Sequence, residues 1–167
     1  MQRVVHLKQL IYVGFSCFIA ATASAKESSI AVSFSGVLVD SATCYIENSQ
    51  PIEVRFGSQV VVENIDGNQY LQSIPFRLSC SQLNSNSMRL KIQGRTRSVD
   101  GRSVLDAGKN GLGIALYHNR ANMTPNSWYS FTYPNTPSLT AAPIKNSNAN
   151  LTLGSFSMTA TLTIEYQ

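Results

Sequence analysis

Few residues of this chain have the type and spacing that catalysis or metal binding requires. Cys44 and Cys80 are too far apart for a Cys-x-x-Cys redox pair, and a metal site would need further thiols or histidines. Asp100 and Asp106 flank a turn, so we expect these carboxylates to serve that turn rather than to act as an acid–base pair. His118, at the end of an expected strand, is expected at the surface. These residues therefore predict no enzyme, no metal, no cofactor and no small-molecule substrate.

The first 25 residues have the pattern of a secretory signal peptide. Two basic residues precede the apolar run 10–21, and Ala23-Ser24-Ala25 supplies the small residues that signal peptidase accepts. This run of about 12 residues is shorter than the roughly 20 that a membrane-spanning helix needs. Cleavage would leave residues 26–167, a length that fits one domain.

An exported chain enters an oxidising compartment, where paired cysteines form disulfides. Cleavage after residue 25 would remove Cys17 and leave two cysteines. We therefore predict a structural Cys44–Cys80 disulfide. Closing a loop of this length removes about 4 kcal/mol of unfolded-state entropy in the chain-entropy model, which is a large share of the stability of a small domain.

The basic charge of the chain is modest once the signal peptide is set aside. The full chain has a net charge of +4, and Arg3 and Lys8 contribute two of its 13 basic residues. Arg89 and Lys91 alternate with apolar residues, which is typical of the solvated face of a strand rather than of a nucleic-acid patch. We therefore expect no nucleic acid among the partners.

The rest of the chain is predicted to be almost entirely β. No stretch of ten or more residues has apolar groups at helical spacing between recognisable caps. Turn residues such as Asp66-Gly67, Asp100-Gly101 and Lys109-Asn110-Gly111 separate short apolar-rich segments. Many short strands in one domain favour a β-sandwich. The expected strands are 30–38, 52–56, 59–62, 74–80, 88–93, 113–117, 127–133 and 154–166.

The last expected strand alternates strictly between apolar and polar residues, which predicts one buried and one exposed face. A strand at the end of a chain is an edge strand or a strand that awaits a partner, and exposed apolar edges are normally avoided. We therefore expect this edge to be covered. The residues that carry this prediction are Gly154, Phe156, Met158, Ala160, Leu162, Ile164, Tyr166 and Gln167.

The segment that follows the signal peptide shows the same alternation. Gly36 replaces an apolar side chain in mid-strand, which weakens a strand unless another backbone approaches closely. This strand either completes its own domain or is given to a neighbouring molecule. The positions that share one face are Ile30, Val32, Phe34, Gly36 and Leu38.

Together these features resemble the pilin subunits of chaperone–usher fimbriae, such as type 1 and P pili. The resemblance covers nearly all of residues 26–167, and the stretch 63–75 is most similar to minor tip and adaptor subunits. It depends on the order and spacing of several motifs rather than on any one of them. These motifs are the amino-terminal segment with Gly36, the cysteines Cys44 and Cys80, Val54-Arg55-Phe56-Gly57, Ile74-Pro75-Phe76, residues 111–116, Gly154 and the penultimate Tyr166.

The resemblance implies an all-β, incomplete immunoglobulin-like sandwich that lacks its final strand and leaves an apolar groove beside the carboxy-terminal strand. A periplasmic chaperone would lend a strand to this groove and hold the carboxyl terminus, and the extension of the next subunit would then replace it. By position, residues 1–25 would be the signal peptide, 26–40 the donor-strand extension and 41–167 the pilin domain. The implied partners are the chaperone, an outer-membrane usher and other pilins. The implied location is a fimbrium at the cell surface, where the subunit supports cell adhesion.

Several roles remain open within this resemblance. The chain could be a minor tip or adaptor subunit, a major rod pilin or a terminator. An adhesin of this family would carry a second, lectin domain, for which residues 26–167 have no room. A secreted β-sandwich that binds a receptor through its own surface is the remaining alternative. Its candidate aromatic residues are Trp128, Tyr129, Phe131 and Tyr133, although Tyr129 and Phe131 share a face and are expected in the core.

Overall fold

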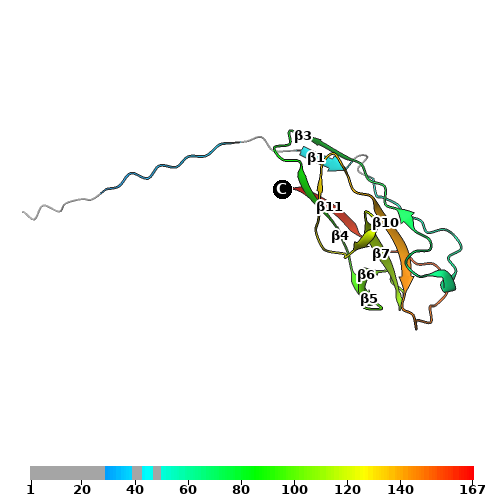
Figure 1. Cartoon of the computed structure of the whole chain (residues 1–167). Coiled ribbons are helices and arrows are strands. Elements are labelled where there is room, and N and C mark those ends of the chain that lie inside the picture. The colour runs from blue at the N-terminus through cyan, green and yellow to red at the C-terminus, as the bar shows by residue number, and fades with distance from the viewer. Residues whose placement is uncertain (1–28, 39–42, 47–49) are drawn as a thin grey trace, which may run out of the picture. The chain divides into compact units, whose positions relative to one another are not determined.

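The computed structural model describes residues 29–38, 43–46 and 50–167 (Figure 1). Backbone contacts divide the chain into two units, Met1–Leu38 and Val39–Gln167. The predicted signal peptide, residues 1–25, lies outside the described residues. In the described ranges, no helix is long and apolar enough to cross a membrane.

The described part of the first unit, residues 29–38, has no regular secondary structure. All ten of its residues are exposed, and Ile30 and Phe34 keep 89% and 93% of their surface accessible. The prediction of a strand at 30–38 is therefore wrong for the isolated chain, because none of the described residues pairs with this segment. Its apolar side chains have the alternation of a strand but no ladder to join.

The second unit is built almost entirely from antiparallel strands (Figure 1). The elements are β1 (Thr43–Ile46), η1 (Val62–Asn64), β2 (Gln72–Ser73), β3 (Leu78–Ser81), β4 (Ser87–Gln93), β5 (Thr96–Val99), β6 (Arg102–Asp106), β7 (Leu112–His118), β8 (Ala121–Met123), β9 (Tyr129–Thr132), β10 (Leu139–Lys145) and β11 (Thr161–Tyr166). One sheet has the strand order β2-β10-β7-β6-β5, with β8 also paired to β7. A second sheet has the order β11-β4-β9, and β1 and β3 form a separate pair.

The core lies between the two larger sheets. Leu90 and Ile92 point from β4 toward Ile114 and Leu116 of β7, and all four side chains are buried. Polar residues occupy the alternate positions of β4, as period-two patterning requires. This arrangement is a β-sandwich, as the sequence predicts, and Arg89 and Lys91 lie on the outer face of β4, where both are half-buried.

A smaller apolar cluster covers the other face of the β7 sheet. Val99, Val104 and Ala115 are fully buried there and pack against Tyr117. The Tyr117 hydroxyl donates a hydrogen bond to the Gly67 carbonyl and accepts one from Arg102, whose guanidinium also lies 4.8 Å from the centre of the Tyr117 ring. These polar contacts hold a loop and a long side chain over the outer face of the sheet.

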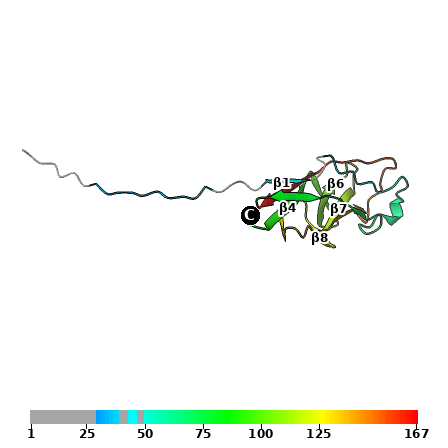
Figure 2. The ribbon, with the colours of Figure 1, turned by 90° about the horizontal axis from the view of Figure 1, so that it is seen from above.

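The disulfide Cys44–Cys80 is present and joins β1 to β3, where the two cysteines face each other in the ladder. In both views the carboxyl terminus lies at the end of the second unit that also holds β1, and η1 lies at the opposite end (Figures 1 and 2). Two of the expected strands, 88–93 and 113–117, are confirmed as β4 and β7. The expected strand at 127–133 contains β9.

Three other expected strands differ from the structure. No strand forms at 52–56 or 59–62, and the expected strand at 154–166 is reduced to β11. The missing segments still alternate: Ile52, Val54 and Phe56 are half-buried, and the residues between them are exposed. The side chains therefore choose faces as they would in a strand, but the backbone has no neighbouring strand to bond.

Candidate functional site

The segments that failed to form strands are the two walls of an apolar groove with a volume of about 910 Å³. One wall is the segment 54–62, which approaches η1, and the other is 151–158, which leads into β11. The floor is part of the sandwich core. The apolar residues that line the groove are Val54, Phe56, Val60, Val62, Ile65, Leu112, Ile114, Leu151, Leu153, Phe156 and Met158.

Both walls present backbone groups without backbone partners. Within the described part of the chain, residues 50–60 and 154–160 make no backbone–backbone hydrogen bond. Among the described residues β11 is bonded only to β4, so its other edge has no neighbouring strand there. A row of unpaired N–H and C=O groups beside buried apolar side chains is the template for an added β-strand.

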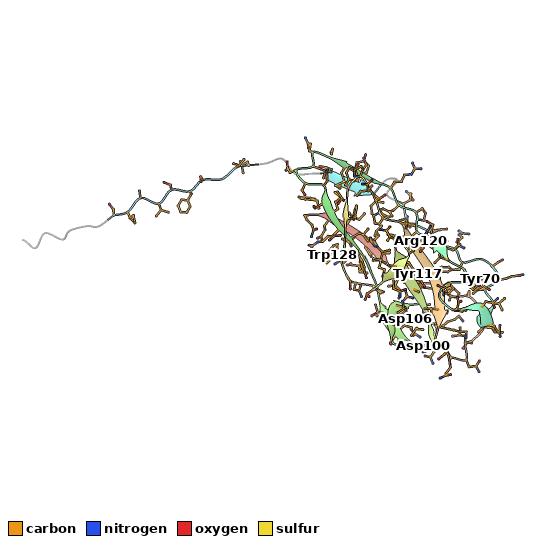
Figure 3. All side chains as sticks on the ribbon, viewed as in Figure 1. Tyr70, Asp100, Asp106, Tyr117, Arg120 and Trp128 are labelled. Carbon is orange, nitrogen blue, oxygen red and sulfur yellow. A yellow bond between two sulfur atoms is a disulfide. The ribbon has the colours of Figure 1, made fainter. Side chains whose placement is uncertain are left out.

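Short polar contacts hold the walls in place. The Tyr70 hydroxyl, near η1, accepts a hydrogen bond of 2.9 Å from the Val61 N–H (Figure 3). On the other wall, the Lys109 ammonium donates to the carbonyls of Thr152 and Leu153, at 3.0 and 3.3 Å. These contacts fix the ends of the walls but leave their central backbone groups free.

The Lys109 contact is supported by a cluster at the β6–β7 turn (Figure 3). Asp106 accepts a hydrogen bond of 2.9 Å from the Gly108 N–H, and its carboxylate lies 3.0 Å from the Nε of Arg97. Because that Nε is not aligned for a hydrogen bond, the contact is an ion pair. Arg97 in turn donates to the Lys109 carbonyl at 2.8 Å.

The hydrogen bond from Gly108, followed by the interactions with Arg97 and Arg95, lowers the pKa of Asp106 below its ordinary value of 3.8. Burial of the carboxyl opposes this shift and is outweighed. Asp106 is therefore a charged structural group of the turn, as the sequence predicts. Its ionised form indirectly positions Lys109 at the end of the groove.

Two aromatic side chains meet across the groove. Phe56 on one wall and Phe156 on the other stack with ring centroids 6.1 Å apart and planes inclined by 25°. Near this pair Gly154 has φ +110°, a conformation that favours glycine, and a Cβ there would meet only the Lys109 ammonium, at 3.9 Å. The groove thus has filled space at Phe156 and open space two residues earlier.

A family model described as fimbrial protein matches residues 32–167 of the chain. The chain belongs to the fimbrial protein family. It is 33% identical over 156 residues to the uncharacterized fimbrial-like protein YfcR of Escherichia coli strain K12, in a match that covers 90% of this chain and 88% of that protein. It is 28% identical over 135 residues to the fimbrial adapter PapF of Escherichia coli, with 74% of this chain and 80% of that protein covered. The solved structure of the P pilus adaptor subunit PapF matches with a TM-score of 0.55 and covers 74% of this chain and 95% of that one.

This membership confirms two predictions from the sequence. The resemblance to chaperone–usher pilins, with relatives of the adaptor type, is confirmed by the family model and by PapF. The fold is the immunoglobulin-like sandwich lacking a strand that this resemblance implies. Members of the fimbrial family are in general structural subunits that form surface pili and interact with other pilins.

The expected groove strand of this fimbrial protein is only partly assembled around the groove. Gly154, Phe156 and Met158 line it, and Leu162 and Ile164 are half-buried in β11 against the core. The remaining predicted positions are exposed: Ala160, Tyr166 and Gln167. The N–H of Gln167 donates to the Ser87 carbonyl at 2.8 Å, which anchors the carboxyl terminus to β4.

Sequence reasoning missed the groove wall at 54–62 and the Lys109 ammonium that contacts the other wall at Thr152 and Leu153. Residues 54–57 contributed to the family resemblance but were not predicted to line a groove, although the apolar alternation of 52–56 indicates one buried face. Leu151 and Lys109 carry no such signal, because each reaches the groove through a turn. In the described residues no group of histidines, cysteines and acids is placed to hold a metal ion.

Two predictions outside the groove also have outcomes. Tyr129 and Phe131 pack against the core, as expected, whereas Trp128 lies on the outer face of its sheet between Arg89 and Lys91, at 4.5 and 4.4 Å from the ring centre. The expectation of a surface position for His118 is wrong. His118 is half-buried, its ring lies against the Tyr129 ring with centroids 5.3 Å apart and planes inclined by 33°, and its Nε2 atom is buried. It lies on the same face of β7 as Ile114 and Leu116, so its side chain faces the opposite sheet.

Proposed function

We propose that this chain is a minor tip or adaptor subunit of a chaperone–usher pilus and that it polymerises by donor-strand exchange. The observation that carries the proposal is the apolar groove with unpaired backbone along both walls. The adaptor role is supported by the similarity to PapF, which is described as an adapter subunit of the P pilus. In this proposal a periplasmic chaperone fills the groove first, an outer-membrane usher receives the complex, and the assembled pilus supports cell adhesion.

The proposed donor is the extension, residues 26–40, with Ile30, Val32, Phe34, Gly36 and Leu38 facing the groove of a neighbouring subunit. The pilin domain is then 41–167, and residues 1–25 are the signal peptide that directs export to the periplasm. The exposure of the described extension supports a donor role, because its apolar face has no partner among the described residues. Burying each large side chain contributes roughly 1.5–3 kcal/mol, against which the cost of ordering the segment must be set.

The orientation of the donor follows from the sheet. Every strand pair in the described part of the second unit is antiparallel. An added strand of the same kind would run antiparallel to residues 154–166 and would bring its carboxyl end to the Leu151–Gly154 end of the groove. Its inward side chains would extend the core from Leu162 and Ile164 toward Leu112.

The test is the binding of a synthetic peptide of residues 28–41 to the full chain, purified from a bacterial periplasm and kept dilute so that copies do not fill one another's grooves. We expect saturable binding and new protection from hydrogen exchange at 52–60 and 154–160. Copurification with a coexpressed periplasmic pilus chaperone, released by the peptide, would support the delivery step. A scrambled peptide of the same composition is the control. A chain that ignores the peptide and the chaperone would refute the proposal.

A further inference from the structure

The outer face of the β11-β4-β9 sheet carries two cations that meet on one aromatic ring. The guanidinium carbon of Arg89 lies 4.5 Å and the Lys91 ammonium 4.4 Å from the centre of the Trp128 ring (Figure 3). The two charges are therefore within about 9 Å of each other, which is close to one Debye length at physiological ionic strength. The ring attracts both cations, and this attraction offsets part of their mutual repulsion.

These two charges are only partly neutralised. Glu165 is the one acidic side chain among the outward residues of β4, β9 and β11, and its Oε2 atom accepts from Nε and Nη2 of Arg89 at 3.1 and 2.8 Å. Lys91 makes no ion pair with any of the described residues. An anion that approaches the Lys91 ammonium therefore has no resident carboxylate to displace.

The residues beside the two cations are hydroxyl donors rather than apolar side chains. In the ladders Thr163 of β11 lies opposite Lys91, and Ser130 of β9 lies opposite Arg89. Directly opposed residues share a face of the sheet, so both hydroxyls lie beside the cations. Such a face suits a ligand with many oxygen acceptors. We call it the Trp128 face, and its residues are Arg89, Lys91, Trp128, Ser130, Thr163 and Glu165.

The existing contact of Arg89 decides which anion fits best. A carboxylate pairs most strongly with parallel N–H groups along one edge of a guanidinium, and Glu165 already occupies the edge formed by Nε and Nη2. The donors that remain are the other Nη of Arg89 and the rotating ammonium of Lys91. A sulfate group has several free oxygens that point in different directions, so it can accept from both cations at once.

We propose that the Trp128 face binds a sulfated polysaccharide. This goes beyond the function proposed above, because it requires neither the groove nor polymerisation. A nucleic acid fits less well, since its bases need an aromatic surface to stack on and here two cations occupy that surface. A polysaccharide carries many sulfates in series, so one chain could contact the same face on several subunits of a fibre and bind more tightly than to one subunit.

The test is the binding of a fluorescent heparin hexasaccharide to the full chain, purified from a bacterial periplasm and followed by anisotropy. We expect saturable binding that weakens as salt is added. Lys91→Gln should weaken binding at least about tenfold. Lys145→Gln is the matched control, because it removes the same charge from β10 in the other sheet, and it should change binding less than about twofold. A hyaluronan oligosaccharide, which has carboxylates but no sulfates, should bind at least about tenfold more weakly than heparin.

Two further substitutions test the arrangement of the face rather than its charge alone. Glu165→Gln frees the edge of Arg89, so it should strengthen heparin binding about threefold and reduce the preference for heparin over hyaluronan. Glu63→Gln in η1 removes the same charge elsewhere and should do neither. Trp128→Leu keeps every charge but removes the ring that holds the cations together, so it should weaken binding about threefold or more, whereas Trp128→Phe should bind almost normally. Should Trp128→Leu fail to fold, the Lys91 and Glu165 comparisons decide.

Four results would overturn the proposal. They are no saturable binding of heparin at low ionic strength, equal losses in Lys91→Gln and Lys145→Gln, equally tight binding of hyaluronan, and equally tight binding of a single-stranded DNA of the same charge. The peptide of residues 28–41 is titrated into the same variants and should bind all of them alike. A chain that binds heparin as expected but ignores the peptide and the chaperone would refute the proposed function and leave this proposal intact, and the opposite pair of results would do the reverse.

Discussion

The substitution Asp106→Asn tests whether the charged turn behind Lys109 stabilises the sandwich. Asn keeps an oxygen that can accept from the Gly108 N–H, so the change removes mainly the charge that faces Arg97. The two side chains are 14% and 24% exposed, so the pair is partly buried and less screened than a surface ion pair. Loss of one partner of a charged contact in such a place costs about 1–3 kcal/mol. We expect the urea midpoint at pH 7 to fall by roughly 0.5–1.5 M.

The contribution of Asp106 to the free energy of unfolding depends on pH with a definite sign. The pKa of Asp106 is lowered below 3.8 in the folded chain, so its ionised form stabilises the fold at all pH values above the unfolded pKa. This contribution is lost as the pH falls through the folded value, which lies below 3.8. The unmodified chain and Asp106→Asn should therefore differ at pH 7 and at pH 4.5, and converge only in strong acid.

Asp66→Asn is the matched control. The pKa of Asp66 is also lowered, first by the hydrogen bond from the Gln69 N–H and then by that from Asn68, but this carboxylate is fully exposed and has no basic partner in the described residues. Asn can accept both hydrogen bonds, so little change is expected. Equal urea midpoints for the unmodified chain and Asp106→Asn at pH 7 would refute the reasoning. So would a difference that persists unchanged at pH 2.

Three further predictions follow from burial and connectivity. In the peptide of residues 28–41, Phe34→Ala should weaken binding to the chain about 10- to 100-fold, whereas Ser35→Ala on the other face should leave binding unchanged. Fluorescence anisotropy titration measures both affinities. Equal effects would contradict the assignment of Phe34 and Ser35 to opposite faces of the donor strand. Leu90→Ala in the chain should lower the free energy of unfolding by about 3–5 kcal/mol, because Leu90 is fully buried between the sheets. Chemical denaturation measures this loss, and a value below about 1 kcal/mol would contradict the position of Leu90 in the core. Replacing both Cys44 and Cys80 by Ala should cost about 4 kcal/mol in the chain-entropy model for a separation of 36 residues, and unmodified chain treated with a reductant should show the same loss.

Alternation along the sequence correctly identified the strands in the middle of sheets. In 88–93 and 113–117 the apolar positions are buried, and both strands have neighbours on two sides. The hairpin at Asp100-Gly101 was only half predicted. Both turn residues have positive φ, as expected, but the charged residues next to them concealed the strands β5 and β6 on either side.

β10 was missed because Pro143 lies inside it, and proline is usually excluded from strands that are paired on both edges. The ladder accommodates it because the Pro143 carbonyl points away from β7 and accepts from the Gly67 N–H, 3.0 Å away. The absent N–H points to that same side, so no bond to β7 is lost. The composition of a strand can be read from the sequence, but the edge on which its N–H groups must donate hydrogen bonds to a neighbouring strand cannot.

At the walls of the groove, the sequence predicted strands where the structure has none. Residues 52–56 and 154–160 have the alternation of strands, and sequence reasoning assigned strands to both. A ladder, however, is a property of two segments, and the segment that would lie between these walls is not present among the described residues of the second unit. The period of the side chains is therefore predictable from one chain, whereas the pairing depends on a partner.

The outer face of β11 explains why a free edge here favours ordered addition of a strand over unspecific association. Its outward residues are polar, and Glu165 lies opposite Arg89 of β4, whose two guanidinium nitrogens both donate to the Oε2 atom of Glu165, at 2.8 and 3.1 Å. The next position along β4, Lys91, stacks with Arg89 on Trp128, so that the largest aromatic surface on this face is covered by two cations. A charged face resists stacking of a second sheet, because stacking would remove these charges from water. Among the described residues, the second edge of β11, with its apolar inward positions Leu162 and Ile164, has no neighbouring strand, and a strand added there would extend the core without covering the charged face.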